Sequence, residues 1–366
     1  MLRLIRYIVA VVAFTVGGGY ALSAQELRLG ADFVTLFDNT EYASMQGISS
    51  GTLFGSRLTP KLGVAWDEHN ELMVAVDMLQ NFGHDTRLFS DVDMQLYYAY
   101  RAPRVTALAG IFPRSEMRGL QSQLFFDRSY RFYNNRISGV LARYEDHSRG
   151  DSYIEFAMDY TGMRDFDTRE SFSIMSSGCM DAEWLYFGYD FSMGHYAKDY
   201  NPATRDGVVD NLLLVPYLGY RCKVAAPSRE VHFDLRLQYV QSLQRDRVNE
   251  SRWLSPSGAE IYVAVEWCDI RLSNRYYVGR GVIFPYYDRY GADLYYGMPL
   301  YGSKQKIYES LELSYSRRFF DDTVALEAGI TIDYEGTGWG TRQWLQLSVD
   351  LDYKAAFGRV KNVNNR

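Results

Sequence analysis

Apolar and polar side chains alternate at every second position through most of this 366-residue chain. Val324 and Leu326, for example, belong to an apolar series that is interleaved with Glu327 and Asp333. Successive side chains of a strand point to opposite faces, so the pattern predicts strands with one apolar and one polar face. The same alternation is clear in 91–101, 231–240 and 345–354. The chain is therefore predicted to be all-β.

The alternating segments are about 10 to 15 residues long, which is longer than the strands of a soluble sandwich, at about 5–6 residues. A tilted strand needs roughly 9–11 residues to cross a bilayer. Aromatic side chains also gather near the ends of the apolar faces, where a membrane interface would lie. Every backbone polar group must be paired inside lipid, so such strands must close on themselves. The prediction is a closed antiparallel transmembrane β-barrel whose polar face lines a water-filled lumen.

Sixteen alternating segments are predicted as strands, and the count falls to 14 if 170–178 or the division near Cys268 is wrong. The segments are 26–37, 52–66, 71–82, 91–101, 105–114, 135–146, 152–163, 170–178, 183–195, 210–224, 230–244, 258–267, 269–279, 305–319, 323–335 and 342–357. Short connections alternate with long ones, as expected of a barrel with periplasmic turns at one end and outer loops at the other. The longest connections are 115–134 and 281–304.

The first 24 residues are predicted to be a signal peptide. Arg3 and Arg6 precede the apolar run 7–16, and small residues follow in 17–24. The apolar run is too short to be a membrane anchor, which needs roughly 20 residues. The predicted organisation is a signal peptide at 1–24, a barrel at 25–357 and a periplasmic tail at 358–366. The mature chain is expected in the outer membrane of a Gram-negative bacterium.

The amino-acid composition limits the classes of partner and cofactor that the chain is expected to bind. The chain has 39 basic and 45 acidic residues, a net charge of −6, which does not favour nucleic-acid binding. Its three cysteines are widely spaced and form no metal-binding pattern. No cofactor or metal is expected.

Several segments support a family resemblance. The stretches GIFPR (110–114), FFDRSYRFYNN (125–135) and YVGRGVIFPYYDRYGADLYYGMPLY (277–301) resemble a porin-like outer-membrane barrel family of Bacteroidota. The strand count and the long third outer loop resemble the general-porin architecture. This resemblance implies contact with outer-membrane lipid and lipopolysaccharide, insertion by the barrel-assembly machinery, passage of small hydrophilic solutes, and a homotrimer. It also implies that the third outer loop folds into the barrel.

The third outer loop is basic although the chain is acidic. Between 114 and 136 it holds five arginines against two acidic residues. A basic constriction would favour anions in the lumen. The alternative is a surface loop whose arginines pair with neighbouring acids or lipid phosphates. The candidate constriction residues are Arg114, Arg118, Asp127, Arg128, Arg131 and Arg136.

Two further sets of candidates follow from the strands and the last long loop. Alternation places a set of charged residues on the lumen wall: Arg57, Lys61, Asp77, Asp91, Asp93, Arg236, Arg271, Arg275, Glu327 and Asp333. The last long loop is rich in tyrosine, which either packs the loop on itself or binds a sugar. These outer-loop aromatics are Tyr286, Tyr287, Tyr290, Tyr295 and Tyr296.

Catalysis is not expected from the sequence. A lipid-cleaving barrel needs a serine and a histidine close together on the lipid-facing side. His195 lies near an outer strand end, but Tyr196 and Ala197 follow it, and the chain has no nucleophile elbow, phosphate loop or HExxH motif. The chain is therefore predicted not to be an enzyme. The predicted function is a channel for passive diffusion of small hydrophilic solutes, narrowed by the basic loop. The alternatives are a plugged barrel that binds a surface partner, or a channel specific for a sugar or an anion.

Overall fold

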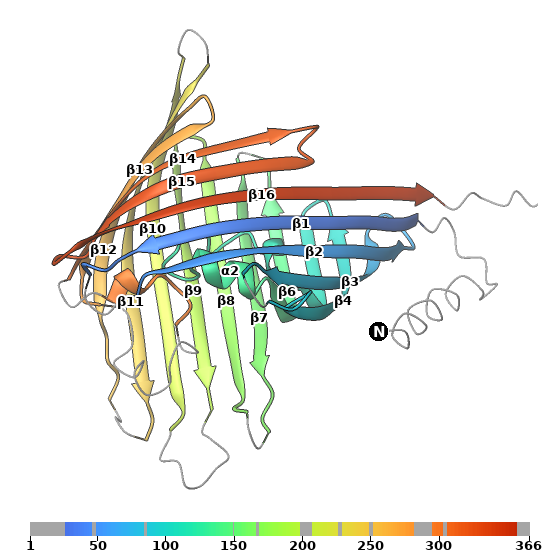
Figure 1. The fold of residues 1–366 in the computed structure, drawn as a ribbon, viewed down its shortest axis with the longest axis horizontal. Helices are drawn as coiled ribbons and strands as arrows, with labels where there is room; N and C mark the ends of the chain where they lie inside the picture. Colours follow the sequence, from blue (N-terminus) through green and yellow to red (C-terminus); the bar gives the residue numbers. More distant parts are fainter. Residues whose placement is uncertain are drawn as a thin grey trace, which may run out of the picture.

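The computed structural model describes ten segments of the chain: 26–45, 49–83, 86–148, 150–165, 168–197, 207–225, 229–248, 252–281, 295–302 and 306–356. Within them, sixteen antiparallel strands form a closed barrel in which each strand pairs with its sequence neighbours and β1 pairs with β16 (Figure 1). The predicted all-β closed barrel is confirmed, and so is the higher strand count. No helix in the described segments is long and apolar enough to span a membrane.

The strand boundaries lie close to the predicted ones. The strands are β1 (Glu26–Glu41), β2 (Gly51–Ala65), β3 (Asn70–Asn81), β4 (Asp91–Ala102), β5 (Val105–Pro113), β6 (Arg136–Asp146), β7 (Ser152–Gly162), β8 (Ser171–Ala182), β9 (Leu185–Tyr196), β10 (Val209–Val224), β11 (Val231–Asp246), β12 (Ser257–Trp267), β13 (Ile270–Gly279), β14 (Ile307–Phe319), β15 (Val324–Tyr334) and β16 (Trp339–Ala356). The division near Cys268 is a two-residue hairpin turn, in which Cys268 and Asp269 have φ angles of 52° and 68°. Positive φ at both central residues matches the twist of adjoining strands, so the chain reverses here without a longer loop.

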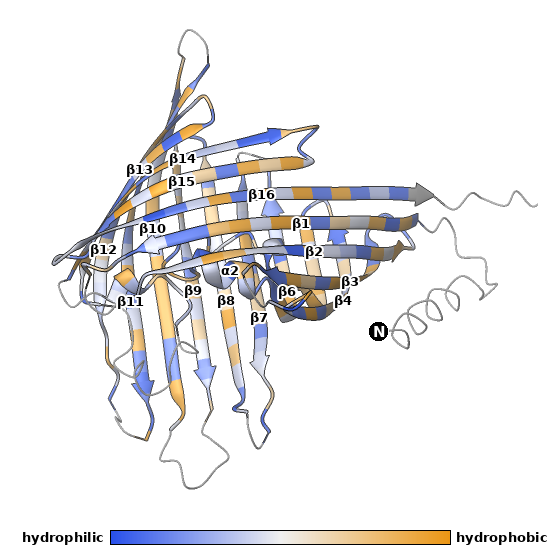
Figure 2. Ribbon diagram, in the orientation of Figure 1, coloured by the Kyte–Doolittle hydropathy of each residue, from blue (hydrophilic) through white to orange (hydrophobic). Residues whose placement is uncertain are grey.

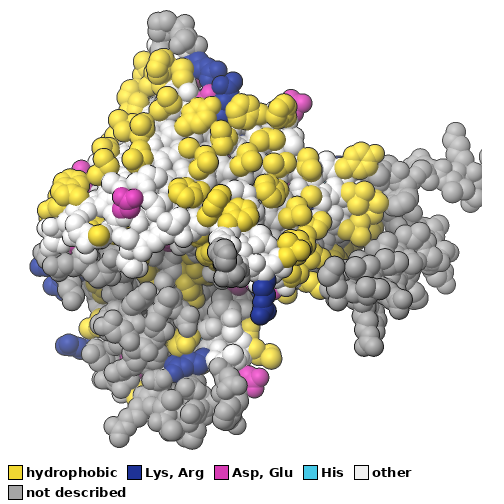
Figure 3. All heavy atoms as spheres, viewed as in Figure 1, with side chains coloured by type: hydrophobic (Ala, Val, Ile, Leu, Met, Phe, Trp, Pro, Cys, Tyr) yellow, Lys and Arg dark blue, Asp and Glu magenta, His cyan; other side chains and the backbone are white. Residues whose placement is uncertain are grey.

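Apolar side chains cover the outside of the barrel. Figure 2 shows hydrophobic and hydrophilic residues alternating along the strands, and Figure 3 shows hydrophobic side chains gathered over β14–β16 and β1. Exposed residues of this surface include Leu311, Leu313, Ile330, Ile332 and Leu345. So large an apolar surface is stable in lipid rather than in water, which supports an outer-membrane location for this porin-like fold.

The connections differ in length at the two ends of the barrel. One end carries the short connections 66–69, 103–104, 147–151, 183–184, 225–230, 268–269 and 320–323, together with the start of β1 and the end of β16. The other end carries the longest connections, 114–135 and 280–306. We call the second end the outer rim. The predicted signal peptide and tail lie outside the described residues.

The lumen contains an apolar core. Wall residues such as Phe112 and Ile137 pack with Leu120 and Leu124 of the third loop and with Leu300 of the last long loop. All five are at most 1% exposed. The third loop, 114–135, also forms the short helices η1 (Arg114–Glu116) and α2 (Arg128–Tyr133), and the last loop forms η3 (Pro299–Gly302). Part of the predicted water-filled lumen is therefore occupied by apolar side chains of the loops, which pack against the wall.

An arginine on the outer surface should test the lipid-facing assignment. Leu237, in β11, is 48% exposed and faces outward. We expect Leu237→Arg to lower the free energy of unfolding by about 2–4 kcal/mol in a bilayer, because a charge near the midplane is costly. Urea titration in lipid vesicles measures this value. Leu237→Ala is the size control, and an equal loss in both variants would contradict the assignment.

Candidate functional site

Ion pairs and hydrogen bonds fasten the third loop to the barrel wall. The Arg114 guanidinium lies 2.6 Å from Asp159 Oδ2 and also donates to backbone carbonyl oxygens of Asn134 and Arg136. Glu116 accepts from Arg101 at 2.6 Å. The Glu155 carboxylate accepts the backbone N–H groups of the Arg118–Gly119 segment. Most charges at the start of the loop are thus used to hold the loop in place.

The second half of the loop is fastened by a buried charge cluster. Arg342, in β16, forms a bidentate ion pair with the carboxylate of Asp38 in β1. It also donates to Asp127 Oδ1 at 2.8 Å. The guanidinium of Arg128 lies 3.6 Å from the centre of the Trp344 ring. Asp38 and Arg342 are only 3–4% exposed. We call the set Asp38, Asp127, Arg128 and Arg342 the loop latch. Because the latch joins residues from both ends of the chain, it can form only once the barrel is closed.

The other predicted constriction arginines have different surroundings. Arg131 donates to Leu120 O at 2.7 Å and to Gln121 Oε1 at 2.8 Å, so it braces the loop against itself. Burial, with the neighbouring Arg114 and Arg128 cations, lowers the pKa of Arg131 to about 10, so the group stays charged at neutral pH. Arg136 pairs with Asp93. Arg118 pairs with Glu145 and Asp151 and also borders a cavity.

Several predicted wall residues form ion pairs away from the loop tip. Arg57 pairs with Asp77 and donates to Tyr133 O at 2.8 Å. Lys61 lies 2.6 Å from Asp32. Asp91 is exposed at the start of β4, and Glu327 is half-buried in β15. Asp333 is fully buried and accepts the hydroxyls of Tyr42 and Tyr308, at 2.9 and 3.2 Å.

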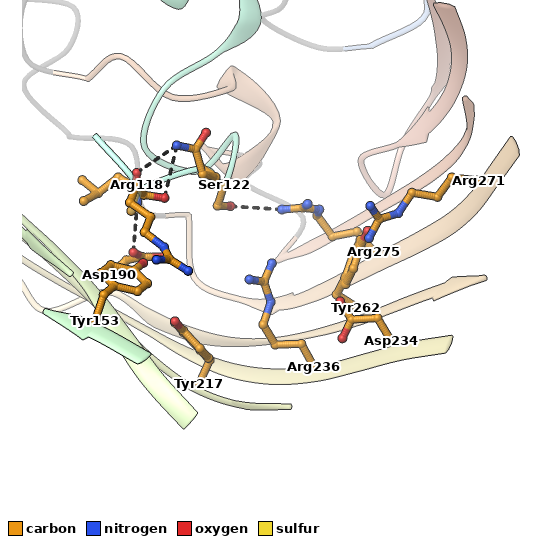
Figure 4. A pocket seen from close by; sticks show the side chains of 13 residues that line it. Arg118, Ser122, Tyr153, Asp190, Tyr217, Asp234, Arg236, Tyr262, Arg271 and Arg275 are labelled. Carbon is orange, nitrogen blue, oxygen red and sulfur yellow. Dashed lines mark hydrogen bonds between the residues drawn. The ribbon is translucent and has the colours of Figure 1, made fainter. Parts of the chain in front are cut away.

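A lumen cavity of about 370 Å³ gathers the remaining wall arginines. Arg236, Arg271 and Arg275 line it together with Arg118 of the loop (Figure 4). Its other lining residues are Gly119, Leu120, Gln121, Ser122, Tyr153, Asp190, Tyr217, Asp234 and Tyr262. The lining holds four arginines and two aspartates, and Arg118, Arg271 and Arg275 are paired with carboxylates that lie outside the lining.

The last long loop packs against the third loop. The Tyr296 ring stacks on Tyr130 with centroids 4.3 Å apart, and Tyr296 O accepts the backbone N–H of Asp127 at 2.7 Å. Tyr295 is buried. These two predicted aromatics therefore make contacts within the protein. Tyr286, Tyr287 and Tyr290 lie outside the described residues.

A second cluster faces outward at the outer rim. His195, near the end of β9, is paired with Asp210 at the start of β10. Its Nδ1 lies 3.4 Å from Asp210 Oδ1. His195 has the same strand parity as the exposed Leu185 and Phe187, and Asp210 that of the exposed Leu214, so both side chains point away from the lumen.

Aromatic and basic residues flank this pair. The Phe172 ring stacks on the His195 ring, with centroids 4.9 Å apart. On the other side, Arg247 and Arg245 donate to Asp210 at 2.7 and 3.1 Å. We call His195, Asp210, Arg245 and Arg247 the rim cluster. It combines an oriented imidazole with two guanidinium groups beside an apolar outer surface.

The comparison with protein families decides the family of this chain. Residues 20–356 match the sequence model of a family described as lipid A 3'-O-deacylase-type. The chain belongs to the lipid A 3'-O-deacylase-type family. No curated protein matches the chain.

Solved structures with a similar fold are outer-membrane porins. The anion-selective porin from Comamonas acidovorans has a TM-score of 0.50 at 10% identity, covering 90% of this chain and 100% of its own. OprB from Pseudomonas putida has a TM-score of 0.48 at 9% identity, with coverages of 88% and 94%. OmpF from Salmonella typhi, in complex with daunomycin, has a TM-score of 0.48 at 9% identity, with coverages of 88% and 97%. At such low identity the likeness establishes a porin-like fold and nothing more.

The prediction that the chain is not an enzyme was wrong, because the family that it belongs to is an enzyme family. The carboxylate partner of His195 is not among the residues that directly follow it along the chain. Asp210 lies 15 positions later, across an outer loop, and reaches His195 by strand pairing. The signal that identifies the pair is strand parity, which places the His195 side chain on the outer face with Leu185 and Phe187.

Proposed function

We propose that this barrel hydrolyses an ester-linked acyl chain of a lipid A-type lipid, and that the rim cluster performs the reaction. The observation that carries the proposal is the His195–Asp210 pair, which faces outward at the outer rim. Family membership supports the same reaction class. A lipid-cleaving site must be reachable from the membrane, and this pair borders the apolar outer surface rather than the lumen.

The chemistry of the rim cluster fits direct attack by water. Asp210 orients the imidazole through Nδ1, which leaves Nε2 to accept a proton from water. The water oxygen then bonds to the ester carbonyl carbon. When the bond from that carbon to the sugar oxygen breaks, the imidazole returns the proton to the sugar oxygen. The products are a fatty acid and a free sugar hydroxyl.

Substrate placement follows from the neighbours of the pair. The guanidinium groups of Arg245 and Arg247 suit the phosphates of a lipid headgroup, since arginine matches phosphate geometry. Arg247 is about half exposed, with a side-chain exposure of 48%, so it is accessible to a headgroup. Phe172 offers an apolar ring beside the imidazole for an acyl chain.

Release of free fatty acid tests the reaction. Purified folded barrel is incubated with lipid A vesicles in ¹⁸O-labelled water. The released fatty acid is then collected, and its mass is measured by mass spectrometry. We expect steady release, with the label in the carboxylate group. Absence of release from heat-modifiable, folded protein would contradict the proposal.

A second candidate function is passive diffusion of small hydrophilic solutes through the lumen, which the basic third loop narrows. The arginine-lined cavity between the loop and the wall favours it. In this proposal Arg118 and the wall arginines, rather than Arg114 or Arg128, set the charge along the solute path. The proposed location is the outer membrane. We propose that the barrel-assembly machinery inserts the chain there and that three copies of the chain form a homotrimer.

Single-channel recording checks the solute path. In a planar bilayer with a KCl gradient we expect discrete current steps and a reversal potential of the sign that marks anion preference. The double variant Arg236→Glu plus Arg271→Glu should shift the reversal potential toward cations, because it reverses two lumen charges. An unchanged reversal potential would contradict the assignment of these residues to the path.

A further inference from the structure

We infer that the lumen cavity is a binding site for the phosphate group of a small solute, centred on Arg236. This inference goes beyond acyl-ester hydrolysis and does not depend on it. It deepens the second candidate function by naming a ligand class. Binding in detergent requires no ion flow, so failure of this site and failure of conduction are separate results.

Arg236 is the arginine of the cavity lining that has no ion-pair partner in the described part of the chain. Among the described residues, no carboxylate lies within 4 Å of its guanidinium and no acceptor forms a hydrogen bond with it. Its Nε atom is buried and unsatisfied. The guanidinium carbon lies over two tyrosine rings, 5.5 Å from the centre of Tyr217 and 5.4 Å from that of Tyr262. A buried donor without an acceptor is costly, so a ligand oxygen that filled this place would be bound favourably.

The neighbouring arginines differ in how far they are neutralised. Arg275 is held by Glu260 at 3.3 Å and donates to Ser122 and Tyr301 at 3.1 and 3.0 Å. Arg271 lies 3.8 Å from the half-exposed Glu266, and its Nε is also buried without a partner. Arg271 is thus loosely paired, and Arg236 is the lining arginine that no carboxylate of the described residues neutralises.

The aspartates of the cavity are engaged by other groups. Asp234 accepts the hydroxyl of Tyr186 at 2.5 Å, and Asp190 accepts the backbone N–H of Leu120 at 3.0 Å. Figure 4 shows Arg236 and Arg275 extending from the wall strands toward Ser122, with Asp190 on the far side beside Arg118. Both aspartates of the lining thus already accept a hydrogen bond from a protein group, whereas the Nε of Arg236 donates none.

Strand pairing fixes the backbone positions of the residues around Arg236. Arg236 of β11 is paired with Tyr262 of β12, and Tyr262 is paired with Arg275 of β13. The three side chains form a row across neighbouring strands, all on the lumen face. A guanidinium group offers paired N–H donors that match the oxygens of a phosphate, and in this row the guanidinium of Arg236 is the one without a carboxylate partner among the described residues. A cavity of about 370 Å³ is within the usual size range of small-molecule sites.

Calorimetric titration of the detergent-solubilised barrel at low salt tests the site. The probes are inorganic phosphate, glucose 6-phosphate and glucose. We expect both phosphates to bind, glucose not to bind, and Arg236→Gln to weaken phosphate binding about tenfold or more. The control Arg317→Gln removes a cation from the end of β14, outside the cavity lining, and should leave binding unchanged.

Three results would overturn the inference: equal binding of glucose, an unchanged affinity in Arg236→Gln, or an equal loss in Arg317→Gln. A separate titration uses micelles that contain a phosphate-bearing lipid. Free phosphate should compete for the cavity, whereas the lipid should not, because the cavity lies inside the barrel. Displacement of phosphate by the lipid would place the phosphate site on the outer surface instead.

Discussion

Replacing His195 with glutamine is expected to lower the rate of fatty acid release about 10²–10⁴-fold, because the variant loses the proton acceptor for water. Glutamine keeps a polar side chain of similar reach but cannot accept and return the proton. The Nδ1 contact with Asp210 is the geometric basis for this role. The measurement is the initial rate of fatty acid release from lipid A vesicles at matched amounts of folded barrel.

The matched control is His232→Gln. His232 lies near the start of β11, at the opposite end of the barrel from His195, and it is exposed. We expect this variant to keep the full rate. Equal rates for wild type and His195→Gln would exclude the rim cluster as the reaction centre. A loss in both variants would show that the effect of replacing a histidine is not specific to the rim cluster.

Removing the central cation of the loop latch has the largest expected effect on stability. Arg342→Met leaves the carboxylates of Asp38 and Asp127 without their main partner in a buried site. Loss of one member of a buried ion pair typically costs about 3–5 kcal/mol, and we expect a decrease of that size in the free energy of unfolding. We also expect larger or more variable current steps, because the third loop is no longer fastened to β16. Urea unfolding and bilayer recording provide the two measurements.

Arg318→Met serves as the control for removal of an arginine from the barrel. Arg318 is exposed in β14, so its replacement should change stability by at most about 0.5 kcal/mol. A double-mutant cycle with Asp127→Asn isolates the link between β16 and the loop. If Arg342→Met and Arg318→Met were equally stable, the latch would not hold the loop.

Alternation predicts the fold of this chain well because the barrel has only two environments. Each strand residue faces either lipid or lumen, so the side of Leu237 or Asp333 follows from its parity. The turn at Cys268 was a weaker prediction because the two strands beside it are separated by only two residues. Register then follows from strand length and turn length.

The roles of the loop residues do not follow from local sequence. Arg128 and Arg131 belong to one basic loop, yet one lies on Trp344, more than 200 positions away in the sequence, and the other bonds to its own loop. Such differences depend on which wall residues the folded loop meets. The partnership of His195 with Asp210 has the same origin, since only strand pairing brings the two together.

We propose that the outer rim of the barrel, and not its lumen, cleaves an acyl ester. The most direct measurement is the mass of lipid A after incubation with wild-type barrel and with Arg236→Gln in parallel. We expect both proteins to remove one ester-linked acyl chain at similar rates, since the lumen cavity plays no part in the proposed reaction. Unchanged lipid mass with the folded wild-type barrel would contradict the claim, and so would a loss of cleavage confined to Arg236→Gln.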